Sequence, residues 1–508
     1  MKSTFSIACR GSWLSLAQAE IFKKKVRALY PDVKIITTII ETSGDKEQTM
    51  PLHLVEGKDF FTKEIQDYLN SNQADFAVHS MKDVSSVDFF KAGHYAIIDR
   101  ELLNDVAIFN ESVVDKIKNG EKIIIGTSSP RRSNMATDFL QKALPKLREQ
   151  TLVLEVQSIR GNVDTRLQKL HSGNYDGIIL AAAGLNRLLQ YEPAKEKVKG
   201  LLQNKKLMLL PLFECPPAAG QGAIVAETTT NNADAIEILE AIKNIPLTNA
   251  IIAERKYAQQ YGYGCSQQFG VFYVDTPTIS FTYASGKDGD AKAFTEWNFK
   301  TALNITGKQL FSSTDYMKDF FTYNFLDDAA IDEAAKVFFI SSHKAVHSTK
   351  IKNVLQQKRV WAAGTRTWYD LAKKGIWVQG CADGLGFDFL QTVFKSPLVN
   401  IAVNDIQIVT NNLSKTHWLQ DGISAVCTYE LAGNLSAAIK SEIAKADIIF
   451  WTSFQQYQLC KAFIKDTVQH VCPAGKTAKL LIVAGLQPII FPTIKAFNYW
   501  RAKQKSEG

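Results

Sequence analysis

Residues 126–132 read GTSSPRR, directly after the apolar run KIII, and the residue types in this stretch could hold an anion. Hydroxyl groups and backbone N–H groups at the start of a helix bind negative groups, and the planar forks of paired arginines bind carboxylates or phosphates through paired hydrogen bonds. Arginine is scarce in this chain, yet six of its 13 arginines lie between residues 131 and 187. The arginines therefore indicate an anion site more sharply than the net charge of +8 does.

Similar polar clusters follow other apolar runs in the first half of the chain. HSMKDV places Lys82 beside Asp83 at the end of such a run, and IRGNVDTRLQKL adds Arg160 and Arg166. A carboxylate beside a lysine stays ionised, so Asp83 could stabilise a developing cation or accept N–H hydrogen bonds. Alone, each of these residues would more often cap a helix or form a surface ion pair. Because the cations, which include Arg10, are spread over many loops, we expect an anion with several carboxylates rather than a single phosphate.

The elements that must position these residues alternate between β-rich runs and helical patterns over the first 240 residues. This alternation predicts α/β layers with mostly parallel sheets, in which functional residues gather at the carboxyl ends of strands. The predicted strands are residues 4–10, 33–42, 74–80, 122–127, 151–159 and 175–184, and the predicted helices are residues 15–30, 61–73, 131–144 and 163–174.

The pattern changes after residue 245. A predicted helix over 249–261 leads into a glycine-bounded turn and strand over 262–274, and residues 275–335 predict a small α+β domain that ends in a linker. From residue 336 the alternation resumes, with β-rich runs beginning at residues 336, 359, 375, 406, 423, 446 and 479. The segments 361–376 and 472–487 resemble each other, which indicates a second α/β unit with two similar lobes.

Several classes of protein are disfavoured by composition. No run of 18 apolar residues predicts a membrane span, and the N-terminal segment lacks the apolar core of a signal peptide, so we expect a cytoplasmic protein. The seven cysteines are scattered without a C-x-x-C pair, and the histidines lack a convincing ligand spacing, so neither a disulfide framework nor a metal site is predicted. Nucleic-acid binding is disfavoured because basic and aromatic residues do not interleave on one face.

Six motifs resemble hydroxymethylbilane synthase, also called porphobilinogen deaminase, and stand in that family's order. They are HSMKDV, GTSSPRR, IRGNVDTRLQKL, YDGIILAAAGLNRL, PPAAGQGAIVAE and GCS, and the resemblance covers residues 4–310. It implies three domains, of which the first two are built like type II periplasmic binding proteins. It also implies that porphobilinogens condense, with loss of ammonia, into the linear tetrapyrrole hydroxymethylbilane on a dipyrromethane cofactor joined to a loop cysteine by a thioether.

The resemblance assigns roles to matching positions of this chain. The cofactor cysteine corresponds to Cys265 and the catalytic aspartate to Asp83, whose fixed carboxylate could stabilise a cationic pyrrole. The remaining cofactor-binding positions correspond to Ser80, Lys82, Thr127, Ser129, Arg131, Arg132, Arg160 and Arg166, and the substrate-binding, lid and hinge positions to Arg10, Ser12, Lys58, Lys63, Arg187 and Gln221. The acetate and propionate groups of a polypyrrole chain would then be the carboxylates that the arginines bind. We expect a monomer that binds porphobilinogen and polypyrrole intermediates, with no nucleic-acid or membrane partner.

Three positions depart from the family pattern. Asn104 stands where a further arginine is usual, the lid reads EGKDFF rather than a glycine-pair form, and SQQFG follows Cys265 in place of a proline-containing turn. These changes concern the lid and one contact between domains rather than the chemistry.

Residues 336–508 are similar, through fainter motifs, to uroporphyrinogen-III synthase, a protein of two α/β lobes that takes hydroxymethylbilane as its substrate. The motifs are FFISSHKAV, VWAAGTRTWYDLAKKGI, ADIIFWTSFQQY and CPAGKTAKLLIVAGLQP. Hydroxyl groups at strand ends would face the cleft between the lobes, although such groups often only cap helices. The candidates for this second site are Thr452, Ser453, Tyr457 and Thr477, with Thr365 and Thr367 in the first of the two similar segments.

The sequence therefore predicts a fused enzyme for two consecutive steps of tetrapyrrole biosynthesis. The expected domains are residues 1–104 with 206–244, residues 105–205, the cofactor-cysteine domain 245–330, and the synthase-like region 336–508. Two alternatives remain: a deaminase with a degenerate C-terminal region, and a two-lobed protein that binds a small anion without chemistry.

Overall fold

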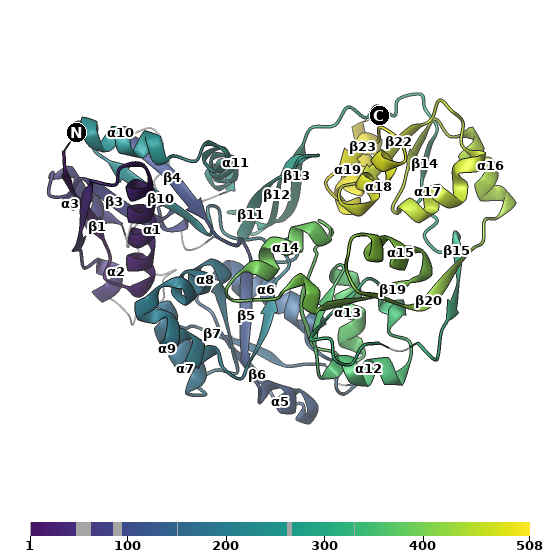
Figure 1. Cartoon of the computed structure of the whole chain (residues 1–508), viewed down its shortest axis with the longest axis horizontal. Helices are drawn as coiled ribbons and strands as arrows, with labels where there is room; N and C mark the ends of the chain where they lie inside the picture. Colours follow the sequence, from purple (N-terminus) through teal and green to yellow (C-terminus); the bar gives the residue numbers. More distant parts are fainter. Residues whose placement is uncertain are drawn as a thin grey trace. The chain divides into compact units, whose positions relative to one another are not determined.

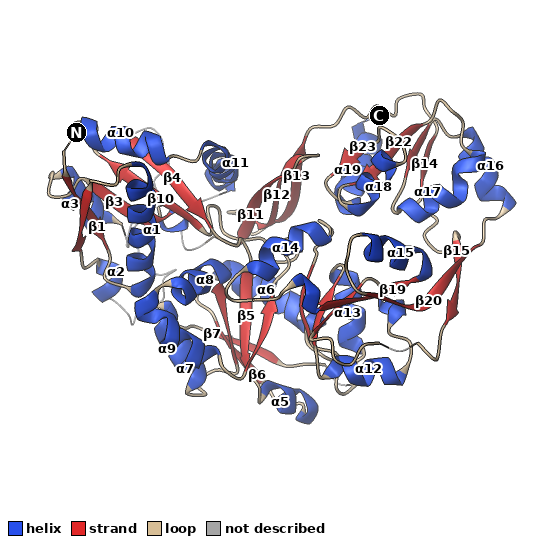
Figure 2. Ribbon diagram, viewed as in Figure 1, coloured by secondary structure: helices blue, strands red, loops and turns tan. Residues whose placement is uncertain are grey.

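A computed structural model describes residues 2–46, 62–84, 94–149, 151–261, 267–329 and 331–507. The chain forms two compact units (Figure 1). The first comprises residues 1–141, 148–273 and 283–296, and the second comprises residues 142–147, 274–282 and 297–508. In both units helices lie against the faces of the larger sheets (Figure 2).

The first lobe of the first unit contains a five-stranded sheet in the order β2-β1-β3-β10-β4. Strands β1, β2 and β3 run parallel, whereas β10 returns antiparallel to both β3 and β4. Phe22 packs on Phe76 with ring centroids 5.0 Å apart, and burying each such side chain contributes about 1.5–3 kcal/mol. The elements are β1 Thr4–Cys9, α1 Trp13–Leu29, β2 Lys34–Ile39, α2 Ser43–Lys46, α3 Lys63–Asn70, β3 Phe76–Ser80, the short 3₁₀ helix η2 Met81–Asp83, β4 His94–Arg100, β10 Ala223–Thr228 and α10 Ala233–Ile242.

The second lobe repeats this plan with the strand order β7-β6-β8-β5-β9. Strand β6 is parallel to β7 and β8, and β5 is antiparallel to β8 and β9. The chain crosses between the lobes twice, once between β4 and β5 and once between β9 and β10. The elements are β5 Asp105–Asn110, α5 Val113–Asn119, β6 Ile123–Gly126, α6 Pro130–Ala143, β7 Leu154–Gln157, α7 Val163–His171, β8 Gly177–Ala181, α8 Ala182–Gln190, α9 Glu192–Leu202 and β9 Lys205–Leu209.

A helix and a three-stranded sheet follow the two lobes. They are α11 Ile245–Tyr261, β11 Phe269–Asp275, β12 Ser280–Lys287 and β13 Ala293–Phe299. The carboxylate of Glu254 on α11 is fully buried, and it accepts hydrogen bonds from Arg100, from the backbone N–H of Gly220 and from the backbone N–H of Tyr273, each at 2.9 Å. This carboxylate therefore ties the helix to the lobe crossovers and to the first strand of the small sheet.

The second unit has two lobes of its own. One contains the six-stranded sheet β15-β20-β19-β16-β17-β18 and the other the parallel sheet β14-β21-β22-β23. The strands are β14 Leu310–Ser312, β15 Phe321–Phe325, β16 Val337–Ile340, β17 Arg359–Ala362, β18 Val378–Cys381, β19 Ile406–Asn411, β20 Ala425–Gly433, β21 Ile448–Phe450, β22 Gln469–Pro473 and β23 Ile489–Phe491. The helices are α12 Thr349–Gln356, α13 Thr365–Lys373, α14 Phe387–Lys395, α15 Asn412–Gln420, α16 Ala437–Lys445, α17 Phe454–Cys460, α18 Lys476–Val483 and α19 Ile494–Glu507, with 3₁₀ turns η3 His343–Ala345, η4 Val403–Asp405 and η5 Lys461–Phe463.

The observed layers confirm the predicted α/β fold, and they also confirm the two similar segments. In each of these segments a strand, β17 or β22, ends in a turn that contains glycine, and a helix, α13 or α18, follows. Gly364 and Gly475 occupy the residue before each helix. None of the helices in the described part of the chain has the length and apolarity of a membrane span.

Two expectations about the C-terminal half are corrected. The run 479–485, expected to be β-rich, lies largely in α18, because only Ala478 and Leu481 face the core while Val483 is 78% exposed. The C-terminal unit also begins before residue 336, since β14 pairs with β21 and β15 pairs with β20. These two strands are three and five residues long, too short to produce a periodic signal in the sequence.

Candidate active site

A pocket in the first lobe gathers polar residues from the start of α1 and the end of β3. Arg10, Ser12, Gln18, Ser80 and Asp83 are among the residues that line it. Ser12 caps α1 by accepting a hydrogen bond from a backbone N–H at 3.3 Å, and the side-chain amide of Gln18 donates to the Ser80 hydroxyl at 2.7 Å. Arg10 follows β1, and Asp83 lies in η2, directly after β3. The ends of β1 and β3 therefore bring Arg10, Ser12, Ser80 and Asp83 to one pocket, together with Gln18 from α1.

Asp83 lies in an electrostatic field made by cations from both lobes. It acts to raise the pKa of Lys82, but removal from water and the neighbouring Arg132 and Arg166 lower that pKa on balance. Burial lowers the pKa of Arg166 to about 10, and Arg132 and Arg160 act in the same direction while Asp83 opposes them. Mutual repulsion of this kind indicates that cations are crowded at the site, which a bound polyanion would relieve.

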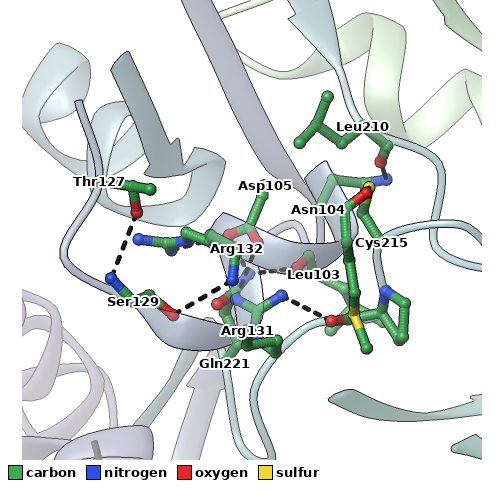
Figure 3. Close-up of polar contacts among 12 residues, drawn as sticks. Leu103, Asn104, Asp105, Thr127, Ser129, Arg131, Arg132, Leu210, Cys215 and Gln221 are labelled. Atoms are coloured by element: carbon green, nitrogen blue, oxygen red, sulfur yellow. Dashed lines mark hydrogen bonds and ion pairs between the residues drawn. The ribbon is translucent and has the colours of Figure 1, made fainter. Parts of the chain in front are cut away.

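The paired arginines of GTSSPRR converge on one buried carboxylate, that of Asp105 at the start of β5 (Figure 3). Arg131 and Arg132 each approach a different oxygen of Asp105 at 2.8 Å, and the Gln221 amide donates to it at 3.0 Å. Arg131 also donates to the carbonyl of Pro216 at 2.6 Å, so much of its guanidinium is engaged within the protein. Burial alone would raise the pKa of Asp105, but the two arginines hold it well below its usual range.

The same network joins the two lobe crossovers (Figure 3). Gln221, in the second crossover, donates to the carbonyl of Leu103 in the first at 2.6 Å. Asn104, the departure from the usual arginine, donates to the carbonyl of Leu210 at 2.9 Å. Arg187 on α8 contacts Asp99 at 3.1 Å and donates to the carbonyl of Gly222 at 2.6 Å. Gln221, predicted to lie at the hinge, and Arg187, predicted to bind substrate, therefore both lie in contacts between the lobes.

We expect Asp105→Asn to destabilise the protein by about 3–5 kcal/mol, because it leaves two buried arginines without their carboxylate. A depressed carboxyl pKa contributes stability that is present above the unfolded pKa of about 3.9 and is lost as the pH falls through the folded value. The difference between wild type and variant should therefore be full at pH 7 and shrink below about pH 4. Urea unfolding of wild type and variant at pH 7 and at a pH below about 4 measures this difference in the free energy of unfolding.

Asp115→Asn is the matched control, because its carboxylate is 73% exposed and pairs with Lys118 on the surface at 3.2 Å. That exposed pair is worth about 0–1 kcal/mol. Equal losses in the two variants would contradict a structural role for the Asp105 ion pairs.

The other predicted residues of the first unit are distributed around this centre. Thr127 follows β6 and accepts a hydrogen bond from the Ser129 backbone N–H at 3.3 Å, and the Ser129 hydroxyl accepts one from the Arg132 backbone N–H at 3.5 Å. Arg160 follows β7, and Lys63 is exposed at the start of α3. Lys58 and Cys265 lie outside the described residues.

In the second unit, three of the four candidates meet at the ends of β21 and β22. Thr452 donates to the side-chain oxygen of Gln456 at 2.7 Å, and Ser453 forms a capping box with the same glutamine at the start of α17. The Thr477 hydroxyl donates to the carbonyl of Thr452 at 3.5 Å. Tyr457 packs against aromatic rings instead, with its ring centroid 6.0 Å from that of Trp451. The hydroxyls of Thr452 and Ser453 thus also stabilise local structure.

Sequence reasoning missed three residues that hold the first site in place: Gln18, Asp105 and Glu254. Asp105 carries the clearest signal, because an aspartate that directly precedes the apolar run VAIF at a strand start must be either exposed or paired. Among the described residues, no group of three or more histidine, cysteine or acidic side chains could hold a metal ion.

The two lobes, their double crossover and the cationic cluster at their strand ends define a two-lobed α/β protein of the periplasmic-binding-protein type. A model of the family "Porphobilinogen deaminase, dipyromethane cofactor binding domain" matches residues 5–237. Porphobilinogen deaminase of Fusobacterium nucleatum is 34% identical over 289 residues, which cover 56% of this chain and 87% of that protein. That of Listeria innocua is 36% identical over 281 residues, which cover 54% and 82%. The chain therefore belongs to the porphobilinogen deaminase family.

Solved structures similar to parts of the chain include two of different kinds. Uroporphyrinogen-III synthetase from Helicobacter pylori is 15% identical, with a TM-score of 0.25, and the match covers 36% of this chain and 91% of that one. The L-cystine solute receptor of Neisseria gonorrhoeae is 11% identical, with a TM-score of 0.25, and the match covers 52% and 95%.

The N-terminal part of the chain is a porphobilinogen deaminase with a domain for a dipyrromethane cofactor. The described residues fit such a group. The cations Lys82, Arg132 and Arg166 lie close together and outnumber the nearby carboxylates of Asp83 and Asp105. The buried Nε of Arg132 has no hydrogen-bond partner within the described ranges. Because the chain belongs to the porphobilinogen deaminase family, the alternative of a two-lobed protein that binds a small anion without chemistry no longer applies.

Proposed function

We propose that Asp83 is the catalytic carboxylate of the deaminase and that Cys265 carries its cofactor. The dipyrromethane, when bound, supplies the terminal pyrrole carbon to which each new porphobilinogen is joined. The chain's own residues bind and orient: Arg10 and Ser12 line the pocket beside Asp83, and Arg132 and Arg166 approach from the second lobe. The observation that carries this assignment is that Asp83 is the one carboxylate among the described residues that line the pocket, and that the pocket lies beside a cluster of cations.

The division of labour follows from charge. Loss of ammonia from a pyrrole substrate develops positive charge, which only a carboxylate in this cluster can stabilise. The acetate and propionate groups of the growing chain are negative. Lys82 and Arg166 interact electrostatically with Asp83, and Arg132 and Arg160 act on these two cations in turn. Arg131 is largely engaged by Asp105 and Pro216, so its role in this proposal is to hold the crossovers and, with Arg132, to share that carboxylate.

We infer further that the second unit is a uroporphyrinogen-III synthase acting on the deaminase product. Its two lobes and the meeting of Thr452, Ser453 and Thr477 at strand ends support this proposal, beside the motif resemblance of residues 336–508. The alternative is a C-terminal region without catalytic activity, in which these hydroxyls act as helix caps only. If the second unit is a synthase, the chain is a bifunctional enzyme of tetrapyrrole biosynthesis. If the second unit has no catalytic activity, the chain is a deaminase with a C-terminal appendage.

The isomer composition of the product distinguishes these cases. Free hydroxymethylbilane closes spontaneously to the symmetrical type I uroporphyrinogen, whereas a synthase inverts the last ring and yields type III. We expect the intact chain, supplied with porphobilinogen, to give predominantly type III product, measured by chromatography after oxidation to porphyrins. Type I product from the intact chain, formed at a normal deaminase rate, would assign the second unit to the non-catalytic alternative.

A further inference from the structure

The two lobes of the second unit contact each other through loops at the ends of their strands. The amide of Gln455, on α17, donates to the hydroxyl of Ser414, on α15 of the other lobe, at 3.2 Å. The backbones of Gly475 and Gly386 also approach closely, because a Cβ built on Gly475 would lie 3.6 Å from the Cα of Gly386. The lobes are therefore closed onto each other at this edge.

The ammonium of a half-buried lysine lies in this closed contact. Lys476, the first residue of α18, places its ammonium 3.7 Å from the centre of the Trp418 ring on α15. The ammonium nitrogen is inaccessible to solvent, and within the described ranges it has neither a hydrogen-bond partner nor an ion pair. Burial lowers the pKa of Lys476 to about 8, Lys479 acts in the same direction, and Asp421 and Asp388 oppose them from a distance.

An ammonium in this position costs stability. A charge withdrawn from water without a hydrogen bond or an ion pair is unfavourable, and the cation–π contact with Trp418 offsets only part of the cost of desolvation. The Trp418 ring satisfies none of the three N–H groups of the ammonium by a conventional hydrogen bond. An anion close to the ammonium would offset this cost, because a carboxylate supplies both an opposite charge and a hydrogen-bond acceptor.

We propose that Lys476 is a substrate-binding residue of the second unit, whose ammonium binds a carboxylate side chain of a linear tetrapyrrole held between the two lobes. This proposal rests on the proposed synthase activity, but it names a cation that the hydroxyl-lined strand ends lack. Lys476 is adjacent in sequence to Thr477, whose hydroxyl donates to the carbonyl of Thr452. A carboxylate at Lys476 would anchor one part of a flexible chain while the hydroxyl-lined strand ends hold another.

The test uses the full-length chain with three substitutions. Lys476→Met keeps the length of the side chain without its charge, Lys476→Arg keeps the charge, and Lys479→Met removes an exposed charge from the same helix. Uroporphyrin III, a macrocycle that bears the same acetate and propionate groups, is the binding probe, followed by its fluorescence. We expect Lys476→Met to weaken binding about 10- to 100-fold, as befits a lost charge-assisted hydrogen bond, with the other two variants within about threefold of wild type.

A second readout separates a binding role from a structural one. Because Lys476→Met removes a buried charge without a partner, its thermal unfolding midpoint should equal or exceed that of wild type. If Lys476 instead had a structural role, its replacement by methionine would lower the thermal unfolding midpoint. Wild-type affinity for uroporphyrin III in Lys476→Met, or a lowered midpoint with unchanged affinity, would overturn the proposal.

The same variants distinguish this proposal from the synthase activity on which it rests. If wild type yields type III product, we expect the type III fraction to fall in Lys476→Met while porphobilinogen consumption stays the same. If wild type yields only type I product but binding still weakens in Lys476→Met, the synthase assignment fails and the carboxylate site stands. If the type III fraction and the affinity are both unchanged in Lys476→Met, the synthase assignment stands and the lysine is not its carboxylate ligand.

Discussion

Asp83→Asn is expected to lower kcat for porphobilinogen consumption by about 10²- to 10⁴-fold with little change in KM. The amide has nearly the same shape as the carboxylate but no charge, so the pocket keeps its form. Lys82, Arg132 and Arg166 remain to bind the substrate carboxylates, which is why ground-state binding should survive. The loss belongs to the transition state, in which positive charge develops on the pyrrole.

The measurement is steady-state porphobilinogen consumption, with ammonia release as an independent readout. Asp67→Asn is the matched control, because Asp67 is exposed on α3 of the same lobe and does not line the pocket. It should retain wild-type kcat and KM. A raised KM with intact kcat in Asp83→Asn would make Asp83 a binding residue and would contradict the catalytic role proposed here.

Cys265→Ser should give a folded protein that lacks the covalent cofactor and loses deaminase activity by about 10³-fold or more. Serine is close in size to cysteine, but its hydroxyl does not form the thioether. The intact mass of the purified variant should equal the sequence mass of 56.6 kDa, whereas wild type should exceed it by one dipyrromethane. A variant that retained both the added mass and normal turnover would move the cofactor to another residue.

The six cysteines in the described part of the chain are poor substitutes for this role. Burial raises the pKa of Cys9 to about 11, and it raises the pKa of Cys460 and of Cys472 to about 12. Thiols with such pKa values are not nucleophilic at neutral pH, because the thiolate is the reactive form. Cys427→Ser is the control, since Cys427 is the one of the six that is partly exposed, and it should keep both cofactor and activity.

Much of the first unit could be predicted from the sequence because its strands are marked on both sides. The run KIII before GTSSPRR and the run ADFAV before HSMKD each have a core of apolar residues and a polar end. Strand β6 ends one residue past the first of these boundaries, and β3 ends two residues past the second. Within each lobe, parallel strands bring their carboxyl ends to one edge of the sheet, so HSMKD and GTSSPRR each lie at the strand ends of their own lobe. The run over residues 479–485 lacked such a marker, and a helix formed there instead.

The partners of the charged residues could not be predicted in the same way. Arg131 and Arg132 look alike in GTSSPRR, yet Arg131 also donates to the carbonyl of Pro216, which lies 85 positions further along the chain. Asp105 gave no sign of being their shared carboxylate, because its pairing depends on how α6 packs against the start of β5. Ion pairs between distant segments carry no local periodicity, so local patterns do not reveal them.

The sequence by itself determined the family of the first 290 residues, the alternation of strands and helices that precedes each polar cluster of the first unit, and the side chains available for chemistry, because each of these depends on local composition and spacing. Only the tertiary structure decided which cations are free to meet a ligand and which are held by the protein. Arg131 is held by Asp105, whereas the ammonium of Lys476 contacts the Trp418 ring and has no hydrogen-bond or ion-pair partner among the described residues. The physical reason is that burial and pairing depend on what other segments bring to a charge, and the long-range packing of the chain sets that.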